Sequence, residues 1–168
     1  MKHLYYCRHG ESTYNLKGIY AGQTDVPLTA LGREQARVAG LDAIDLRIDA
    51  IVTSPLIRAL ETARIVADNA GFDLDKIITD PLFMERSLGS LEGQTYDFGH
   101  EDDESNGTIE PMETLMRRAA EGLELLRSLE AENILLVSHG SFGKALQTVL
   151  NPDRDYGEPP NAQIIKLL

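Results

Sequence analysis

Short apolar runs alternate along this chain with longer stretches in which apolar residues recur at helical spacing. The apolar runs predict strands over residues 4–7, 49–53, 77–79, 133–138 and 162–168. The helical stretches predict helices over residues 30 to the low 40s, 55–70, 111–126 and 140–150. Strands that alternate with helices are joined by right-handed crossovers. The pattern therefore predicts an α/β fold, a three-layer α/β/α sandwich around a mostly parallel central sheet.

The helix over residues 55–70 has the clearest limits. Ser54 is a suitable N-cap, Pro55 fits the first helical position, and Gly71 fits the stop. Its expected apolar stripe consists of Leu56, Leu60, Ala63, Ala67 and Ala70. Thr29 is the expected N-cap of the preceding helix, and residues 80–110 are expected to be irregular. Because no repeat or linker interrupts the pattern, residues 1–168 are expected to form a single domain.

Composition narrows the classes of partner. The chain has 16 Lys and Arg against 27 Asp and Glu, a formal net charge of −11, which disfavours binding to nucleic acid. No apolar run approaches the roughly 20 residues that cross a bilayer, so we expect no membrane partner. Cys7 is the single cysteine, which excludes an internal disulfide and fits a cytoplasmic location. The Met and Leu content leaves room for a homodimer.

Two predicted strands end in the same way. Cys7-Arg8-His9-Gly10 follows the first strand, and Val137-Ser138-His139-Gly140 follows the strand at 133–138. Arg58, in the first turn of the helix after the second strand, can reach back over the same edge because helical side chains lean towards the N-terminus. Ligands of open α/β sheets bind at the carboxyl ends of the strands. Two His and two Arg are therefore expected around one crevice, an arrangement that suits a phosphate.

These motifs continue in order through most of the chain. They comprise Arg8-His9-Gly10-Glu11-Ser12 with Asn15, Gly22-Gln23, Pro27-Leu28-Thr29 with Gly32, Ser54-Pro55-Leu56 with Arg58-Ala59, Glu85 with Gly89, Leu91, Glu92 and Gly93, and Ser138-His139-Gly140. On these residues the chain resembles the histidine phosphatase superfamily, in the branch that contains cofactor-dependent phosphoglycerate mutases and their phosphatase relatives. Met84 and Leu91 depart from residues that relatives often carry there.

The resemblance implies a role for each matching residue. His9 would be the nucleophile that forms a phosphohistidine, and Glu85 would donate a proton to the leaving group and later take one from water. Arg8, Arg58 and His139 would bind the non-bridging oxygens, with Asn15, the Gly140 amide, Gly22 and Gln23 completing the phosphate and substrate site. Glycines beside the histidines would let the backbone approach the ligand. A backbone carbonyl near Gly10 could fix the tautomer of His9. No cofactor is expected.

Other chemistries fit the sequence less well. A Cys-x5-Arg phosphatase would need arginine where the chain has Thr13, and Gly143-Lys144 is followed by Ala145 rather than by Ser or Thr. No Gly-x-Gly-x-x-Gly occurs. His9 and His139 could share a metal, but Arg8 and Arg58 would repel it, so no metal is expected.

The remaining expectations concern the part of the chain that would cover the site and contact the substrate. Residues 93–111 match the position of the family's cap and are short and acidic, which leaves the 97–104 run as either a solvated loop or a recognition element. A short cap and no further tail would expose a phosphohistidine to water, so a phosphomonoester hydrolase acting on a small phosphorylated metabolite is favoured. The alternatives are a phosphoglycerate mutase-type phosphotransferase and a non-catalytic phospholigand-binding module.

Overall fold

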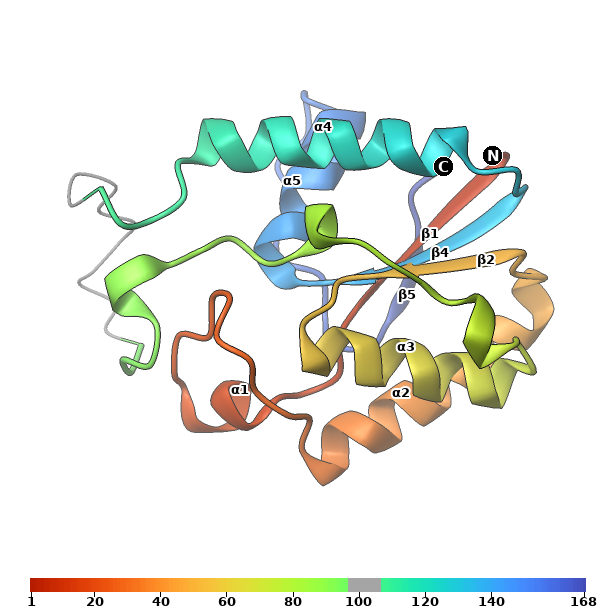
Figure 1. Cartoon of the computed structure of the whole chain (residues 1–168), viewed down its shortest axis with the longest axis horizontal. Helices are drawn as coiled ribbons and strands as arrows, with labels where there is room; N and C mark the ends of the chain where they lie inside the picture. Colours follow the sequence, from red (N-terminus) through yellow and green to blue (C-terminus); the bar gives the residue numbers. More distant parts are fainter. Residues whose placement is uncertain (97–106) are drawn as a thin grey trace.

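The computed structural model describes residues 1–96 and 107–168, and its centre is a five-stranded sheet (Figure 1). The strands are β1 (His3–Arg8), β2 (Ala50–Thr53), β3 (Ile78–Thr79), β4 (Asn133–Ser138) and β5 (Ile164–Lys166). They lie in the order β3-β2-β4-β1-β5. All neighbours are parallel except β5, which runs antiparallel to β1. The expected mostly parallel sheet is confirmed.

Helices cover both faces of the sheet. Helices α2 (Ala30–Ala43) and α3 (Ile57–Ala70) lie on one face, and α4 (Met112–Ser128) and α5 (Gly140–Leu150) lie on the other (Figure 1). Short 3-10 turns occur at Ile44–Leu46, Leu74–Lys76, Pro81–Phe83 and Gly89–Leu91. The three-layer arrangement is as expected. Within the described residues, no helix combines the length and apolar character needed to cross a membrane.

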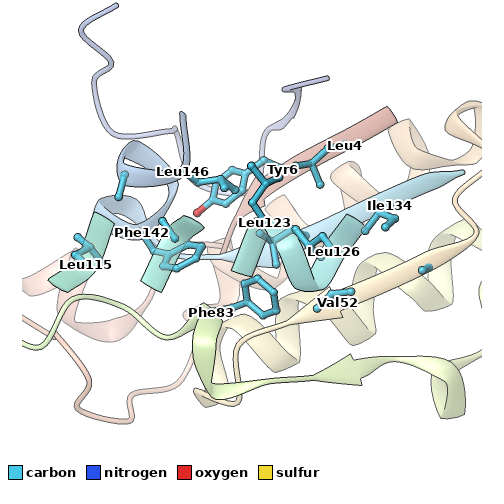
Figure 2. Packing of buried hydrophobic residues seen from close by; sticks show 14 residues of the cluster. Leu4, Tyr6, Val52, Phe83, Leu115, Leu123, Leu126, Ile134, Phe142 and Leu146 are labelled. Carbon is cyan, nitrogen blue, oxygen red and sulfur yellow. The ribbon is translucent and has the colours of Figure 1, made fainter. Parts of the chain in front are cut away.

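The alternation of side chains along the strands divides the core in two. Leu4, Tyr6, Val52, Ile134 and Leu136 face α4 and α5, where Phe83, Leu123, Leu126 and Phe142 pack against them (Figure 2). Cys7, Ile51, Leu135 and Val137 point to the opposite face and pack against small residues of α2 and α3. Because β4 lies in the middle of the sheet, its apolar run is buried on both faces, as its sequence predicts.

Helix α3 differs from the expectation at its start. The helix begins at Ile57 with Leu56 in the N-cap position, and no side chain caps it, so the assignment of Ser54 as N-cap was wrong. Ser54 Oγ accepts from the Leu56 backbone N–H at 3.2 Å and closes a tight bend before the helix instead. Gly71, at φ 73°, ends the helix as expected.

The buried face of α3 also differs from the expected apolar stripe. Arg58, Ala59, Thr62 and Val66 are buried, whereas Leu60 and Ala70 are only partly buried. The reason is the close approach of α2. A Cβ on Gly40 would lie 2.6 Å from Asn69 Cβ and 2.9 Å from the Val66 carbonyl oxygen, so small residues meet where the two helices pack.

The remaining segments complete the comparison with the sequence. The short helix α1 (Thr13–Lys17) was not expected; Ser12 caps it through a capping box with Asn15. The strand expected at 162–168 is shorter, and α4 extends to Ser128. Most of the expected acidic cap, residues 97–106 with the 97–104 run, lies outside the described residues.

Candidate active site

The carboxyl ends of β1, β2 and β4 bring three segments together. Arg8 lies opposite Ser138, and Thr53 lies opposite Val137, so the residues that follow each strand are neighbours. The His9 N–H donates to the Ser138 carbonyl at 2.9 Å, and the Ser54 N–H donates to the Val137 carbonyl at 3.2 Å. Strand register therefore places His9, Ser54 and His139 side by side at one edge of the sheet.

His9 is buried, and its tautomer follows from its hydrogen bonds. Nδ1 lies 2.7 Å from the Gly10 carbonyl, which can only accept, so Nδ1 carries the proton. The lone pair is then on Nε2, which accepts from Arg58 Nε at 3.2 Å. Burial lowers the pKa of His9 well below its usual value, and the charges of Arg58 and Arg8 lower it further. His9 is therefore a neutral imidazole whose unprotonated nitrogen faces a guanidinium.

Arg58 is held rigidly beneath this site. It is 1% exposed, and its two terminal nitrogens donate to the Gly22 carbonyl at 2.7 Å and the Thr24 carbonyl at 2.9 Å. Thr62 Oγ1 links the two motifs, because it donates to the Arg58 carbonyl and accepts from the Gly10 N–H. Gly22 thus contributes a carbonyl that orients Arg58.

His139 lies directly beside His9, with 5.2 Å between the ring centroids. Its Nε2 is 2.8 Å from Ser54 Oγ, and its backbone carbonyl accepts from the Tyr6 hydroxyl. Burial lowers the pKa of His139 well below its usual value, and the nearby charges of Arg58 and Arg8 act in the same direction. Within the described part of the chain, the buried His139 Nδ1 has no hydrogen-bond partner.

Arg8 also keeps an unused donor. Its Nη1 donates to the Pro159 carbonyl at 3.1 Å and lies 3.1 Å from Glu158 Oε2, while its buried Nε has no partner among the described residues. A buried donor without an acceptor is destabilising by about 1–3 kcal/mol. Arg8 Nε and His139 Nδ1 thus both lack a hydrogen-bond partner among the described residues.

Glu85 caps the N-terminus of α5. Its Oε1 accepts from the Phe142 N–H at 3.0 Å and the Arg86 N–H at 2.9 Å, and its Oε2 accepts from the Ser141 N–H at 3.2 Å. Burial raises the pKa of Glu85, and the Arg86 N–H opposes that shift. The direction is the one expected for a carboxyl that serves as a proton donor near neutral pH.

The structure distinguishes Glu85 from Glu92 as the candidate proton donor, which the local sequence alone could not do. Glu92 accepts from the Gln23 N–H and the Leu88 N–H, both at 3.0 Å, and from Thr24 Oγ1 at 2.6 Å. Glu92 therefore links the loop that contains Gln23 and Thr24 to the segment that contains Leu88. Glu85 instead reaches the wall of the cavity described below.

Other expected site residues have defined places. Asn15 Oδ1 accepts from the Ser12 N–H and hydroxyl, which leaves its Nδ2 as a donor at the cavity wall. Gln23 Nε2 donates to the Glu85 carbonyl at 2.9 Å, so this side chain supports Glu85. A Cβ on Gly140 would meet Arg8 and Glu158, whereas a Cβ on Gly10 would collide with the Gly32 backbone. Gly10 is thus required by packing on α2 and not by approach to a ligand.

A cavity of about 890 Å³ opens above these groups. Its described wall includes Arg8, His9, Asn15, Arg58, Glu85 and Ser141 at the polar end. Tyr20, Leu88, Met112 and Met116 form an apolar side, and Lys144, Asp153, Asp155 and Glu158 carry charge around it. His139, Gly140 and Gln23 are not part of this described wall. The cavity can accept a phosphoryl group and a larger organic part.

The remaining candidate chemistries find little support in the described residues. No group of three or more His, Cys, Asp or Glu within residues 1–96 and 107–168 could hold a metal ion. Burial raises the pKa of the Cys7 thiol to about 12, so it is not a thiolate near neutral pH.

Three supporting residues were missed in the sequence. Ser54 contacts His139, Glu158 contacts Arg8, and Arg118 of α4 holds the segment that carries Glu85. Ser54 was predicted to be a helix N-cap, because a serine before a proline suits that position as well as it suits a contact with His139. The spacing of Glu110 and Arg118 across the start of α4 carried no recognisable signal.

Comparison with known proteins agrees with this geometry. A family model described as "Histidine phosphatase superfamily (branch 1)" matches residues 4–164. The chain is 38% identical over 165 residues to a probable phosphoglycerate mutase GpmB of Enterobacter sp. (strain 638), covering 89% of this chain and 75% of that protein. It is 34% identical over 163 residues to putative phosphoserine phosphatase 2 of Hydrogenobacter thermophilus, covering 89% and 79%.

A solved structure shows the same fold. Phosphoserine phosphatase from Entamoeba histolytica, in complex with 3-phosphoglyceric acid, superposes with a TM-score of 0.77 at 26% identity, covering 99% of this chain and 90% of that one.

Proposed function

Because the chain belongs to the histidine phosphatase superfamily, we propose that it is a phosphomonoester hydrolase that acts through a phosphohistidine on His9 Nε2. The substrate class is a small phosphorylated metabolite, and the reaction needs no metal. His9, Arg8, Arg58, Glu85 and His139 are the catalytic groups of this proposal.

The observation that carries the proposal is the pair of unpartnered donors beside a neutral nucleophile. Arg8 Nε and His139 Nδ1 are buried without a hydrogen-bond partner in the described part of the chain, and both donate to an anion once His139 is protonated. The His139 ring lies beside the His9 ring, whose Nε2 holds a lone pair. In a chain of net charge −11, these donors form a local site for an anion. A tetrahedral phosphoryl group supplies several acceptor oxygens and an electrophilic phosphorus at once.

The first half-reaction forms the phosphoenzyme. His9 Nε2 attacks phosphorus, the bond from phosphorus to the ester oxygen breaks, and the Glu85 carboxylic acid donates its proton to that oxygen. The negative oxygens of the phosphoryl group are stabilised as it moves by Arg8 and Arg58, and by His139 once this histidine is protonated beside the bound anion. The Gly10 carbonyl stabilises the positive charge that develops on the ring through the Nδ1 proton.

The second half-reaction releases phosphate. The Glu85 carboxylate takes a proton from water, the water oxygen attacks phosphorus, and the bond from phosphorus to Nε2 breaks. Glu85 returns to its acid form and His9 to its neutral form. In a phosphotransferase, a second substrate hydroxyl would replace the water.

The alternative of a phosphoglycerate mutase-type transferase is supported by the name of the Enterobacter relative, and hydrolysis by the name of the Hydrogenobacter relative. The cavity of about 890 Å³ has room for a water molecule beside a phosphoryl group, which supports hydrolysis. A cytoplasmic location, a homodimer and the absence of a nucleic-acid partner are further parts of the proposal. The location is supported by the single buried cysteine, the absence of a nucleic-acid partner by the acidic net charge, and the homodimer by the Met and Leu content.

The test compares His9→Ala with His3→Ala, a histidine at the opposite end of β1 that does not line the described wall of the cavity. With 4-nitrophenyl phosphate, we expect His9→Ala to lose turnover and His3→Ala to retain it. Mixing the wild type with labelled substrate and quenching with base should trap an acid-labile phosphohistidine. Retained activity in His9→Ala would refute the proposal. Transfer to a second carbon hydroxyl faster than phosphate release would favour the mutase. Stabilisation by phosphate without turnover would favour a binding module.

A further inference from the structure

The segment that carries Glu85 is irregular, yet side chains from elsewhere hold each of its carbonyl groups. Arg118 Nη1 donates to the Leu82 carbonyl at 2.8 Å and the Met84 carbonyl at 2.6 Å. Ser138 Oγ donates to the Phe83 carbonyl at 2.7 Å. The Glu85 carbonyl accepts from Arg118 Nη2 at 3.2 Å and from Gln23 Nε2 at 2.9 Å. Four consecutive carbonyls are thus fixed, and Arg118 binds three of them.

Arg118 is itself held in one orientation. Its Nε lies 3.0 Å from Glu110 Oε1 and its Nη2 lies 2.8 Å from Glu110 Oε2, a bidentate pair in which the side chains are 16% and 11% exposed. Its guanidinium carbon lies 5.4 Å from the centre of the Phe142 ring. The Phe142 N–H in turn donates to Glu85 Oε1. Arg118 therefore contacts both the backbone of Glu85 and a residue that holds its carboxylate.

We propose that Arg118, oriented by Glu110, is a positioning residue that holds Glu85 at the place where it donates a proton to the leaving oxygen. This inference rests on the proposed function, in which Glu85 is the proton donor. Arg118 does not line the described wall of the cavity, so it acts through Glu85 and not on the substrate. Lysine cannot replace it, because one ammonium group cannot match the planar fork that binds three carbonyls and a carboxylate together.

The proposal predicts a loss that depends on the leaving group. An aliphatic alkoxide is a strong base and needs a proton as the ester bond breaks, whereas 4-nitrophenolate is a weak base and needs little help. A displacement of Glu85 by about 1 Å can reduce the rate about 100-fold where its proton is required. A general loss of folding would reduce the rate on both substrates equally.

The experiment measures kcat/KM of Arg118→Lys on 4-nitrophenyl phosphate and on an alkyl monophosphate. We expect the alkyl substrate to lose about 100-fold and the aryl substrate less than about threefold. Glu110→Gln keeps Arg118 but weakens its orientation, and should shift the ratio of the two rates in the same direction. Arg117→Lys is the matched control, because Arg117 is exposed and its charge pair with Glu121 lies on the surface at 3.9 Å. It should leave both rates unchanged.

A double variant separates positioning from an independent effect. Arg118→Lys combined with Glu85→Gln should be no slower on the alkyl substrate than Glu85→Gln alone, because the proton donor is already lost. Equal losses on both substrates, or additive losses in the double variant, would overturn the proposal.

The outcomes also distinguish this inference from the proposed function. If Glu85→Gln spares the alkyl substrate, Glu85 is not the proton donor and the role of Arg118 falls with it. If His9→Ala remains active, the phosphohistidine itself is refuted. If both of those tests succeed and Arg118→Lys behaves as the wild type, only the present inference fails.

Discussion

Replacing Ser54 with alanine tests how His139 is prepared for catalysis. Ser54 is fully buried, and its Oγ lies 2.8 Å from His139 Nε2. His139 Nδ1 already lacks a partner among the described residues, so Ser54→Ala would leave both ring nitrogens unpaired. The hydroxyl matters most when a bound phosphoryl group brings a proton to His139, because Nε2 must then donate to an acceptor.

The expected loss of activity follows from the contact between Ser54 and His139, whereas the bond that Ser54 Oγ accepts from the Leu56 N–H affects stability alone. A buried group that loses its partner is destabilised by about 1–3 kcal/mol, and more when it is charged. If that penalty applies to the state in which His139 is protonated, anion affinity and kcat/KM should fall about 5- to 150-fold. The free energy of unfolding of the empty enzyme should fall by only about 1 kcal/mol, because His139 is neutral there.

The assay measures kcat/KM on 4-nitrophenyl phosphate, the inhibition constant of vanadate, and urea unfolding. Thr53→Val is the matched control, since it removes another fully buried hydroxyl at the same strand end. Thr53 Oγ1 donates to the Val137 carbonyl at 3.1 Å and to the Ser54 carbonyl at 3.3 Å, and not to His139. It should reduce stability and leave vanadate inhibition unchanged. If Ser54→Ala and Thr53→Val show the same small effect on activity, Ser54 does not prepare His139.

Three further expectations follow from other contacts. Glu158→Gln removes the carboxylate 3.1 Å from Arg8 Nη1, so inhibition by inorganic phosphate should become about two- to fivefold tighter, a modest size because Glu158 is half exposed. Glu132→Gln, which removes an exposed carboxylate that pairs with Lys2 and does not line this cavity, is the control, and unchanged inhibition in Glu158→Gln would contradict the reasoning. Gly40→Ala should lower the free energy of unfolding by about 1–3 kcal/mol in urea because of contacts with Asn69 and Val66, with kcat/KM unaltered, whereas Gly157→Ala, with open space around it, should not. The pKa values of His9 and His139 are lowered in the folded state, so the unfolded chain takes up protons first as pH falls below about 6.5, and the free energy of unfolding should decline there. Added sulfate should raise Tm more at pH 5.5 than at pH 7.5, relative to chloride at equal ionic strength. A shift in Tm that is independent of pH would argue against protonation of His139 beside a bound anion.

The parts of the site that depend on strand ends could be predicted from the sequence. His9 and His139 follow apolar strands, and the carboxyl ends of neighbouring parallel strands must meet at one edge of the sheet. Arg58 could be added because it lies within the first turn of α3 and leans back over that edge. These placements need only the local periodicity and the general rule for parallel sheets.

The rest depends on contacts between segments that are distant in the chain. Nothing local distinguishes Glu85 from Glu92; the choice is made by the Ser141 and Phe142 N–H groups, more than 50 residues later. The same holds for Ser54, whose partner is His139, and for Gly10, whose packing partner is Gly32. Residues 80–96 have no long periodic stretch to interpret, so their geometry depends on side chains and backbone groups from distant segments that bind their backbone.

The reactive groups of the site bind one another in this structure, and this affects how a substrate is recognised. Arg58 Nε donates to the lone pair of His9 Nε2, and Glu158 lies against Arg8. Attack requires that Nε2 be released, so the incoming group must give Arg58 another acceptor while it presents an electrophile to Nε2. In the proposed mechanism a phosphoryl group does both, because its non-bridging oxygens would accept from Arg58, Arg8 and His139 while its phosphorus faces the ring. A neutral ester offers too few acceptors for this exchange and would leave the guanidinium on the nucleophile. The hydrogen bond from Arg58 to His9 therefore contributes to selectivity for phosphate as well as to orientation.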